Sequence, residues 1–566
     1  MISAARRAWS RFIRISKLYF TSDSRWQALG LLAALLALLL IISGLNVAIS
    51  YVGRDFMTAI TSREIHQITV FALLYVGVFA ASTVAGAISR FVELLLGLRW
   101  REWLTRQFVH QYLTSHAFSH LNRRSEVDNP DQRISEDLRT FTTTSLSFLI
   151  MATNSVLTII AFMGVLWSIT PWLVLAGVVY PLLGTTLIVF LGHRLVGLNN
   201  LQLKKEADFR FELVHVRTHA DSVALAQSEP AEQGRLEDRL AALVRNYRSI
   251  IAVLRNLKFV TGGYNYLDQL IPVLIVVPLY LRGEVEFGVV TQAAMAFSQI
   301  FNAFSLIAEK FQDLSTFAAV VARVGSLEEA MTESIEPSRQ PIQVAEAEAP
   351  VAYQQVTLRA PKDERVLVRD LSLEVPHGRR ILLTGPNSAG QYALFHAAAG
   401  LWNKGSGHIR RPAHQRVMFL PEQPYMVPGT MRDQFRMAVR DGSVSDERIR
   451  QALGKVHLDD LVDRLGGLDT ENDWGNALTL GEQQRIAFAR LLLTEPDYAF
   501  LYNAASALSE SQREEVYKLL KGTPISYISV GDLQPSLLGS HDTLIELRPD
   551  GSWKTGPIPR KDGQPS

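Results

Sequence analysis

A glycine-framed loop is the first group of residues in the sequence whose types and spacing suggest chemistry. In RRILLTGPNSAGQYALF, a hydrophobic strand leads into Gly385, four further residues, Gly390 and then an apolar helix. This is the frame of a P-loop, whose backbone N–H groups and helix N-terminus hold phosphate oxygens. The candidate cofactor-binding residues are therefore Gly385, Pro386, Asn387, Ser388, Ala389, Gly390, Gln391 and Tyr392.

The last two residues of this loop depart from what phosphate chemistry needs. A P-loop carries Lys and then Ser or Thr where this chain has Gln391 and Tyr392. Gln391 is a neutral donor, so a charge-assisted hydrogen bond worth about 1.5–3 kcal/mol is lost. Tyr392 cannot hold Mg²⁺ as a Ser or Thr hydroxyl does. Glycine-framed loops also occur in folds that bind no nucleotide, so the loop alone does not decide the function.

Two carboxylates in apolar segments form a second group of candidates. Asp268 interrupts YNYLDQLIPVLIVVPLYL, and Glu93 follows another apolar run. An ionisable residue at membrane depth is costly, so each is a candidate functional group. The alternative for Asp268 is that its helix extends past the bilayer and the carboxylate faces a water-filled cavity.

Composition indicates which elements carry these residues. The chain has 566 residues, of which 48% are hydrophobic and 20% charged, so it is neither disordered nor an ordinary soluble enzyme. A net charge of +2 gives no field that would attract nucleic acid. The absence of cysteine excludes disulfides, thiolate zinc sites and iron–sulfur clusters, and no metal site is predicted.

The N-terminal half predicts a membrane domain. Six apolar segments approach the roughly 20 residues that a membrane-spanning helix needs. Residues 1–25 are not a signal peptide, because arginines interrupt their apolar residues; they predict an amphipathic helix on the membrane surface. The predicted spans are 27–52, 68–90, 144–168, 171–197, 258–281 and 288–308.

Loop charge predicts the orientation of the spans. The N-terminal arm and the loops 98–143 and 198–257 are rich in Arg and Lys, whereas the connection 282–287 is short and nearly neutral. The positive-inside rule therefore places both termini and both long loops in the cytoplasm. An integral multi-pass protein of a bacterial inner (plasma) membrane is expected.

A change in pattern marks a second domain. Residues 326–350 are acidic, contain proline and lack a sustained apolar period, which predicts a linker. From residue 351 the pattern is strand, loop and helix. The predicted fold is an α-helical membrane domain followed by an α/β P-loop-type domain. Its expected parts are a permease, 1–325; the linker, 326–350; a nucleotide-binding domain, 351–560; and a tail, 561–566.

Two motifs in the first long loop give a family resemblance. They are LRWREWLT, from residue 98, and NPDQRISEDLR, 129–139. From the residues alone, the second is a short solvated helix opened by Asn129 and Pro130. Together the motifs resemble the half-transporters of ABC subfamily D and their SbmA/BacA-type bacterial relatives. That resemblance implies a coupling element between permease and nucleotide-binding domain, formed by Asn129, Pro130, Asp131, Gln132 and Arg133.

The resemblance also assigns the remaining motifs of the second domain. LTLGEQQ is similar to the ABC signature, in which Thr479, Gly481 and Glu482 act on the nucleotide of the opposite subunit. Tyr502 and Asn503 stand where the Asp and Glu of Walker B belong. The resemblance further places Glu422 at the Q-loop Gln and Asp532 at the switch His, so the catalytic equivalents Asn503, Asp532 and Glu422 are all degenerate.

The resemblance implies a dimeric transporter with ATP and Mg²⁺ as family cofactors, bound weakly or not at all by this chain. We expect little or no autonomous ATPase activity, because phosphoryl transfer depends on positioning and charge stabilisation. The favoured hypothesis is a half-transporter that works with an ATP-competent partner. The alternatives are an ATP-independent, ion-gradient-driven transporter with a pseudo-nucleotide-binding domain, or a non-transporting regulatory subunit. The implied substrates are peptide-, cobalamin- or acyl-CoA-like, and the sequence does not choose among them.

Overall fold

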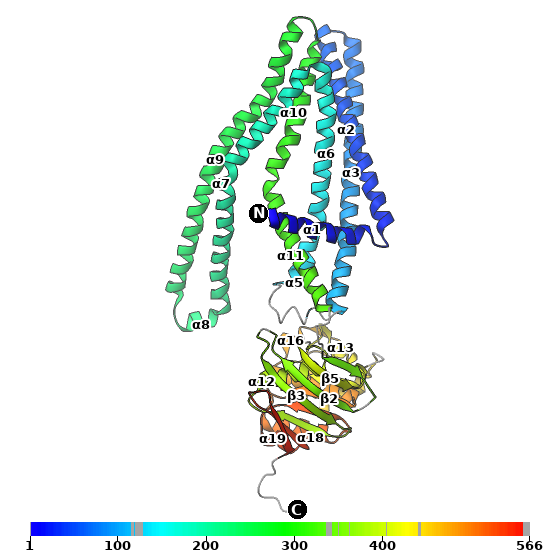
Figure 1. The fold of residues 1–566 in the computed structure, drawn as a ribbon, viewed down its shortest axis with the longest axis vertical. Coiled ribbons are helices and arrows are strands. Elements are labelled where there is room, and N and C mark those ends of the chain that lie inside the picture. Colours follow the sequence, from blue (N-terminus) through cyan, green and yellow to red (C-terminus); the bar gives the residue numbers. More distant parts are fainter. Residues whose placement is uncertain are drawn as a thin grey trace, which may run out of the picture. The chain divides into compact units, whose positions relative to one another are not determined.

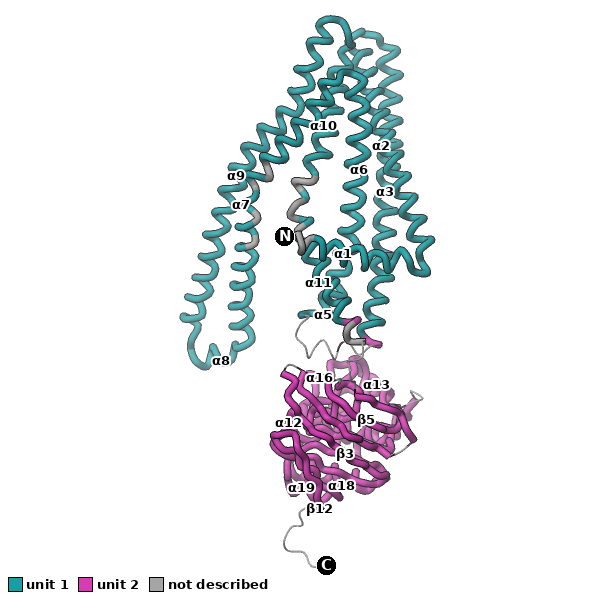
Figure 2. Tube along the Cα trace, in the orientation of Figure 1, with its two compact units in different colours: residues 1–112, 127–330 teal, residues 113–126, 331–566 magenta. Residues whose placement is uncertain are grey.

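The computed structural model describes residues 2–558 apart from 115–117, 119–127, 336–341, 349, 362, 403 and 440–442. The chain forms two compact units, shown in teal and magenta in Figure 2. The first contains residues 1–112 and 127–330, and the second contains 113–126 and 331–566. The expected tail, 561–566, lies outside the described residues.

The first unit is helical throughout its described part. A long apolar helix satisfies its own backbone hydrogen bonds, which is why such sequences form helices in a membrane. Arg63, with φ 59°, ends the second helix in a left-handed turn. The helices are α1 (Ile2–Phe20), α2 (Arg25–Ser62), α3 (Ile65–Thr114), α5 (Pro130–Gln132), the π-helix η1 (Arg133–Asp137), α6 (Leu138–Ile169), α7 (Pro171–Thr218), α8 (Ala220–Leu225), α9 (Glu229–Leu281), α10 (Phe287–Glu309) and α11 (Phe311–Ile335).

Helix α10 lies at the centre of the packing, against α2, α6, α7 and α9. Its apolar face, including Ala293, Phe297 and Ile300, is buried with Phe162 and Leu166 of α6. Helices α7 and α9 run side by side as a long pair joined through α8 (Figure 1). The predicted spans 171–197 and 258–281 therefore belong to helices that continue through most of the loop 198–257.

Each of the six predicted spans lies inside a separate helix: α2, α3, α6, α7, α9 or α10. Among the described residues, four helical stretches are long and apolar enough to cross a membrane. The shorter apolar stretch 171–187 belongs to α7, and α10 carries several polar residues. The helical membrane domain is therefore established, and the count of six spans stays a prediction.

The N-terminal helix α1 is held by both ion pairs and aromatic contacts. Arg11 pairs with Glu329 of α11 at 2.6 Å. Near the other end of α1, the Tyr19 ring stacks on Trp100 of α3 at a centroid distance of 6.0 Å. Trp100 belongs to LRWREWLT and is only 2% exposed, so this motif supplies the anchor for α1.

The predicted linker needs correction. Helix α11 continues to Ile335, and residues 343–346 form the strand β1 beside β5. Acidic residues hid the helix: Val324 and Leu327 are buried, but the adjacent Glu328 and Glu329 pair with Arg14 and Arg11 of α1. Within 326–350, residues 336–341 and 349 lie outside the described part.

The described residues of the second unit form three sheets. The first has the order β1-β5-β2-β3, with β1 (Gln343–Glu346), β5 (Gly405–Arg411), β2 (Val351–Arg359) and β3 (Val366–Val375). The second has the order β12-β11-β4-β10-β9-β6 and is parallel except for β12. Its strands are β12 (Trp553–Pro557), β11 (Thr543–Leu547), β4 (Arg380–Thr384), β10 (Ser526–Val530), β9 (Tyr498–Tyr502) and β6 (Val417–Leu420). The short β7 (Gly429–Thr430) and β8 (Glu471–Asn472) form the third.

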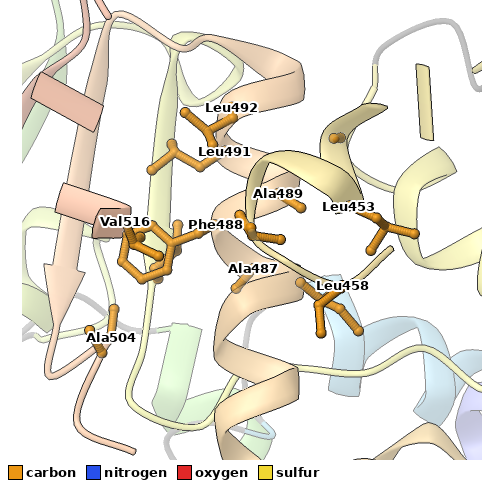
Figure 3. Packing of buried hydrophobic residues seen from close by; sticks show 14 of the residues in the cluster. Leu453, Leu458, Ala487, Phe488, Ala489, Leu491, Leu492, Ala504 and Val516 are labelled. Atoms are coloured by element: carbon orange, nitrogen blue, oxygen red, sulfur yellow. The ribbon is translucent and has the colours of Figure 1, made fainter. Parts of the chain in front are cut away.

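Helices cover the six-stranded sheet and bury its apolar side chains. They are α12 (Ser388–Ala398), α13 (Met431–Arg436), α14 (Asp446–Lys455), α15 (Leu461–Arg464), α16 (Trp474–Ala477), α17 (Leu480–Thr494), α18 (Glu510–Lys521) and α19 (Pro535–Leu538), with a 3₁₀ turn at His414–Arg416. In Figure 3, Ala487 and Phe488 of α17 pack with Leu458 and Val516 from neighbouring elements. This core fixes α17, whose first turn carries the signature residues.

Candidate nucleotide site

The sheet brings four sequence motifs to one edge. Strands β4, β10, β9 and β6 are neighbours and run parallel, so their carboxyl ends meet on the same side. The P-loop frame follows β4, and Asp532 follows β10. Asn503 follows β9, and Glu422 follows β6. Ligands of parallel α/β sheets bind at this edge, which makes it the candidate site.

The backbone of the P-loop is retained. Gly385 has φ 117°, and a Cβ there would lie 2.2 Å from the carbonyl oxygen of Leu547, so only glycine fits. Asn387 caps α12, because its Oδ1 accepts a hydrogen bond from the Gly390 N–H at 2.9 Å. The Asn387 amide also donates to the carbonyl of Leu367 at 2.8 Å. The loop and the start of α12 therefore fit a phosphate group.

Gln391 does not replace the missing lysine. Its side chain is 8% exposed, and Nε2 donates to the carbonyl oxygen of Gly385 at 2.9 Å. The amide is thus used to hold its own loop rather than presented to a ligand. Phosphate oxygens at this edge would meet no lysine at this position.

Two tyrosines replace the residues that would hold Mg²⁺. The rings of Tyr392 and Tyr502 meet edge to face, with centroids 5.7 Å apart. The Tyr392 ring also packs on the imidazole of His396, with the ring centroids 3.8 Å apart. Burial, followed by the nearby charge of Glu422, raises the pKa of Tyr502 above its usual value. A phenolic side chain is not one of the carboxylate and carbonyl oxygens that bind Mg²⁺ in proteins, so these two residues do not fit a divalent cation.

The remaining catalytic equivalents lie at the same edge without restoring the chemistry. Asn503 has φ 48°, and its backbone N–H donates to Val530 at 3.1 Å. Its side-chain amide cannot accept a proton from water. Glu422 and Asp532 are exposed carboxylates, where the family has an amide and an imidazole. The structure therefore gathers the predicted residues at one edge of the sheet.

The sequence interpretation missed Gln484, which ties three motifs together. This residue of α17 is fully buried, and its Nε2 donates to the carbonyl of Glu422 at 2.8 Å and to Ser506 Oγ at 3.0 Å. Its Oε1 accepts a hydrogen bond from the Ala507 N–H at 3.0 Å. The available signal was a polar residue within the buried part of α17, where Gln483 and Arg490 are also buried.

The signature segment is well formed. Thr479 and Glu482 make a reciprocal capping box at the start of α17, with the Thr479 N–H donating to Glu482 at 2.9 Å. Arg464 forms an ion pair with Glu482. Burial opposes ionisation of Glu482, but the hydrogen bonds from Arg464 and Thr479 prevail and lower its pKa. A Cβ on Gly481 would lie 3.3 Å from Ala507 O, so the glycine permits close packing.

Comparisons with known proteins agree with this combination of membrane helices and nucleotide-binding fold. Residues 15–281 match the ABC transporter transmembrane region 2 family, and residues 368–506 match the ABC transporter family. A protein of Synechocystis sp. described as an uncharacterized ABC transporter ATP-binding protein is 37% identical over 95% of this chain and 83% of its own. The chain belongs to the ABC transporter family.

Two further comparisons refine this assignment. ABC transporter D family member 2 of Arabidopsis thaliana, described as chloroplastic, is 33% identical over 96% of this chain and 87% of its own. A structure of a bacterial Atm1-family ABC exporter with ATP bound has a similar fold, with a TM-score of 0.70 and 17% identity over 95% of this chain and 96% of that one. The protein is an ABC half-transporter of the D family, with one membrane region and one nucleotide-binding domain.

In the half-transporter, the NPDQR segment is fixed to α11. Arg133 is 6% exposed; it forms an ion pair with Asp128 and donates to Ser326 Oγ at 2.7 Å. Asp137 accepts two hydrogen bonds of 2.6 Å from Arg323. Asn129, Asp131 and Gln132 stay exposed around the half-buried Pro130. The segment thus has an inner anchor and an outer face, and its coupling role remains a prediction.

The two membrane carboxylates have different surroundings. Glu93 forms an ordinary ion pair with Arg90 at 2.8 Å, one helical turn away. Asp268 is 5% exposed, and its Oδ2 accepts a hydrogen bond from Ser298 of α10 at 2.6 Å. Its other oxygen, Oδ1, has no hydrogen-bond partner among the residues that the structure describes. Asp268 therefore stands out, whereas Glu93 is accounted for by its partner.

Proposed function

We propose that this chain is the ATP-impaired half of a dimeric ABC transporter. The observation that carries the proposal is the contact between Tyr392 and Tyr502, whose rings meet where the family motifs would supply the ligands for Mg²⁺. Gln391 adds to it, because its amide is bonded to the loop itself. The chain's own site is expected to bind Mg·ATP weakly and not to hydrolyse it.

The signature segment gives this chain a remaining role in ATP use. In family dimers each nucleotide lies between the P-loop of one chain and the signature of the other. Thr479, Gly481 and Glu482 keep a capped helix start, the kind of element that suits an anion, with Thr479 exposed and the other two half-buried. The preferred dimer is therefore a heterodimer in which this signature completes the site of an ATP-competent partner.

The test is ATPase activity of the purified chain, alone and with an intact D-family half-transporter. The chain alone should give no activity above a detergent blank, and the mixed dimer should hydrolyse ATP. Gly481→Asp in this chain should abolish the mixed activity, whereas Gln391→Ala should leave it unchanged. Hydrolysis by this chain alone, lost on Gln391→Ala, would contradict the proposal.

The cargo proposed from the family resemblance is a peptide-, cobalamin- or acyl-CoA-like molecule, carried across a bacterial inner membrane with both termini in the cytoplasm. Uptake into vesicles of a radiolabelled member of each class, with and without the partner, tests this part. Transport of none of the three by an ATP-hydrolysing mixed dimer would reject the cargo assignment but leave the ATP-site assignment standing.

A second candidate is gradient-driven transport without ATP. Asp268 favours it, because a buried carboxylate with one unpartnered oxygen can take up a proton within the membrane domain. In this case the nucleotide-binding fold would serve dimerisation. Uptake by vesicles that contain this chain alone, and its loss when an ionophore collapses the proton gradient, would support this candidate.

A further inference from the structure

A cavity of about 430 Å³ lies among α2, α3 and α10, in the half of these helices nearest the α2–α3 turn. Its volume falls within the roughly 300–1,000 Å³ of ligand pockets. Most of its wall is apolar, with Met57 and Tyr75 on one side and Met295 on another. Polar side chains also line it, namely Ser50, Arg54, Gln292 and Thr291, whose hydroxyl donates to the carbonyl of Gly288.

Two of these polar groups are buried without a partner. Ser50 Oγ belongs to a residue that is 1% exposed, and Gln292 Nε2 to one that is 3% exposed. Neither atom has a hydrogen-bond partner among the described residues. A buried polar group is costly unless it is paired, so two unused groups from different helices at one cavity need a physical reason. Both can donate a hydrogen bond to a ligand.

Arg54 adds positive charge to the same cavity. Its guanidinium lies 5.0 Å from the centre of the Tyr51 ring and 2.8 Å from Asp55. Arg54 lines the cavity, whereas Asp55 is not part of the wall. A ligand would therefore meet two neutral donors and a cation on an apolar surface. This combination suits an acceptor-rich or anionic head joined to an apolar chain.

The position along the chain indicates the source of such a ligand. Ser50 and Arg54 flank the end of the predicted span 27–52, and Gln292 lies near the start of the predicted span 288–308. This is the depth at which lipid ester and phosphate groups meet the hydrocarbon, and where a long Arg side chain reaches the interface.

We propose that this cavity binds the phosphodiester head of an anionic phospholipid. Gln292 and Ser50 donate to its ester or phosphate oxygens, and Arg54 supplies the opposing charge. The acyl chain lies along Met57, Tyr75 and Met295. This site lies in the membrane unit and does not depend on the state of the nucleotide site.

Native mass spectrometry of the purified full chain provides the test, with dioleoyl phosphatidylglycerol and dioleoyl phosphatidylcholine as probes. The anionic lipid should bind more tightly. Gln292→Leu and Ser50→Ala should each weaken it about tenfold, as expected for the loss of one buried hydrogen bond. Gln299→Leu and Ser43→Ala, each seven residues away on the same helix, should leave binding unchanged.

Several outcomes would overturn the proposal. One is equal binding of phosphatidylglycerol by Gln292→Leu and Gln299→Leu, and another is equal binding of the two lipids by the unmodified chain. Binding of glycerol phosphate alone would show that the ligand is a soluble phosphate ester and not a lipid. Loss of the dimer in Gln292→Leu with lipid retention unchanged would assign the cavity to a second copy.

A second readout separates a ligand site from a merely structural polar pair. Because Gln292→Leu removes an unpaired buried amide, the lipid-free variant should melt at a higher temperature than the unmodified chain. Added phosphatidylglycerol should then raise the melting temperature of the unmodified chain more than that of the variant. A lower melting temperature of the lipid-free variant would show that the amide has a structural partner and would reject the site.

Discussion

The rings of Tyr392 and Tyr502 are in edge-to-face contact: their centroids are 5.7 Å apart, and their planes are inclined by 80°. Tyr392 lies within α12, the helix that follows β4, and Tyr502 is the last residue of β9. These are the two places from which an ATP site takes its ligands for Mg²⁺. In the proposed impaired site, the replacements at positions 392 and 502 are therefore coupled, because the two tyrosine rings pack against each other.

Restoring this site should need several changes at once. Gln391→Lys alone returns one phosphate contact but leaves Mg²⁺ unheld, and Tyr392→Ser alone leaves the Tyr502 ring in place. We expect Mg-dependent ATPase activity only after Gln391→Lys, Tyr392→Ser and Tyr502→Asp are combined with Glu422→Gln, Asn503→Glu and Asp532→His. Residues that act as a unit are non-additive, so turnover should appear late in the series.

The measurement is phosphate release by each purified variant, with the unmodified chain as baseline. The matched control carries only Gln391→Lys, Tyr392→Ser and Tyr502→Asp. It should bind Mg·ATP but hydrolyse it poorly, because it lacks Asn503→Glu. Turnover restored by Gln391→Lys alone would show that other residues already hold Mg²⁺.

We expect Gln391 to contribute to the folding stability of this domain and not to its affinity for Mg·ATP. Gln391→Ala removes the 2.9 Å hydrogen bond from its side-chain amide to the carbonyl of the half-buried Gly385. The free energy of unfolding should fall by about 1–3 kcal/mol, measured as the shift in a urea or thermal transition. Gln451→Ala, at an exposed position of α14, is the control and should change the free energy of unfolding little. A tenfold loss of Mg·ATP affinity in Gln391→Ala would instead place its amide on phosphate.

Local patterns in the sequence are sufficient to predict the membrane-domain helices and the backbone frame of the P-loop. A strand, a glycine pair and a helix predicted the P-loop, and its backbone is as expected because Gly385 and Asn387 are local determinants. Apolar runs likewise placed each predicted span in a separate helix. Both signals depend on residues that are close in sequence.

Contacts between distant segments could not be predicted in this way. Tyr392 and Tyr502 meet because the sheet places β4 and β9 only one strand apart, on either side of β10. No local pattern in the sequence contains this strand order. The buried Gln484 network needs the same tertiary information. The linker prediction failed for a different reason: Glu328 and Glu329 interrupt the apolar pattern of α11, and the arginines of α1 that pair with them are distant in the sequence.

The signature segment should show acid sensitivity. The pKa of Glu482 is lowered in the folded chain, so its ionised form contributes stability above the ordinary glutamate pKa. That contribution is lost as pH falls from about 4.5 through the lowered value. Thermal unfolding followed from pH 7 to pH 3 should show Glu482→Gln losing less stability on acidification than the unmodified chain. Equal acid dependence of the two would remove Glu482 as a contributor.

Arg464 is the control for the cause of that shift. Arg464→Met removes the ion pair with Glu482 and should move the acid transition to higher pH. Arg450→Met changes a nearby exposed arginine whose contact with Asp463, at 3.6 Å, is looser. It should leave the transition of Glu482 in place.

The predicted topology can be tested because the chain has no cysteine. Leu225→Cys lies at the α7–α9 turn, where Leu225 is 87% exposed, and Glu284→Cys lies in the connection 282–287. A membrane-impermeant maleimide should modify position 284 but not 225 in intact right-side-out cells. Both should react after permeabilisation. Modification of position 225 before permeabilisation would reverse the assigned orientation.

The role of Asp268 can be separated from folding by one conservative change. Asp268→Asn keeps the size and can still accept the 2.6 Å hydrogen bond from Ser298, but it cannot release a proton. If transport is gradient-driven, uptake and its pH dependence should be lost while expression and dimerisation are unchanged. Glu93→Gln is the matched control, because Glu93 is paired with Arg90 and should not affect that pH dependence. Uptake by Asp268→Asn with the pH profile of the unmodified chain would exclude this carboxylate from the transport step and leave the ATP-dependent heterodimer as the remaining proposal.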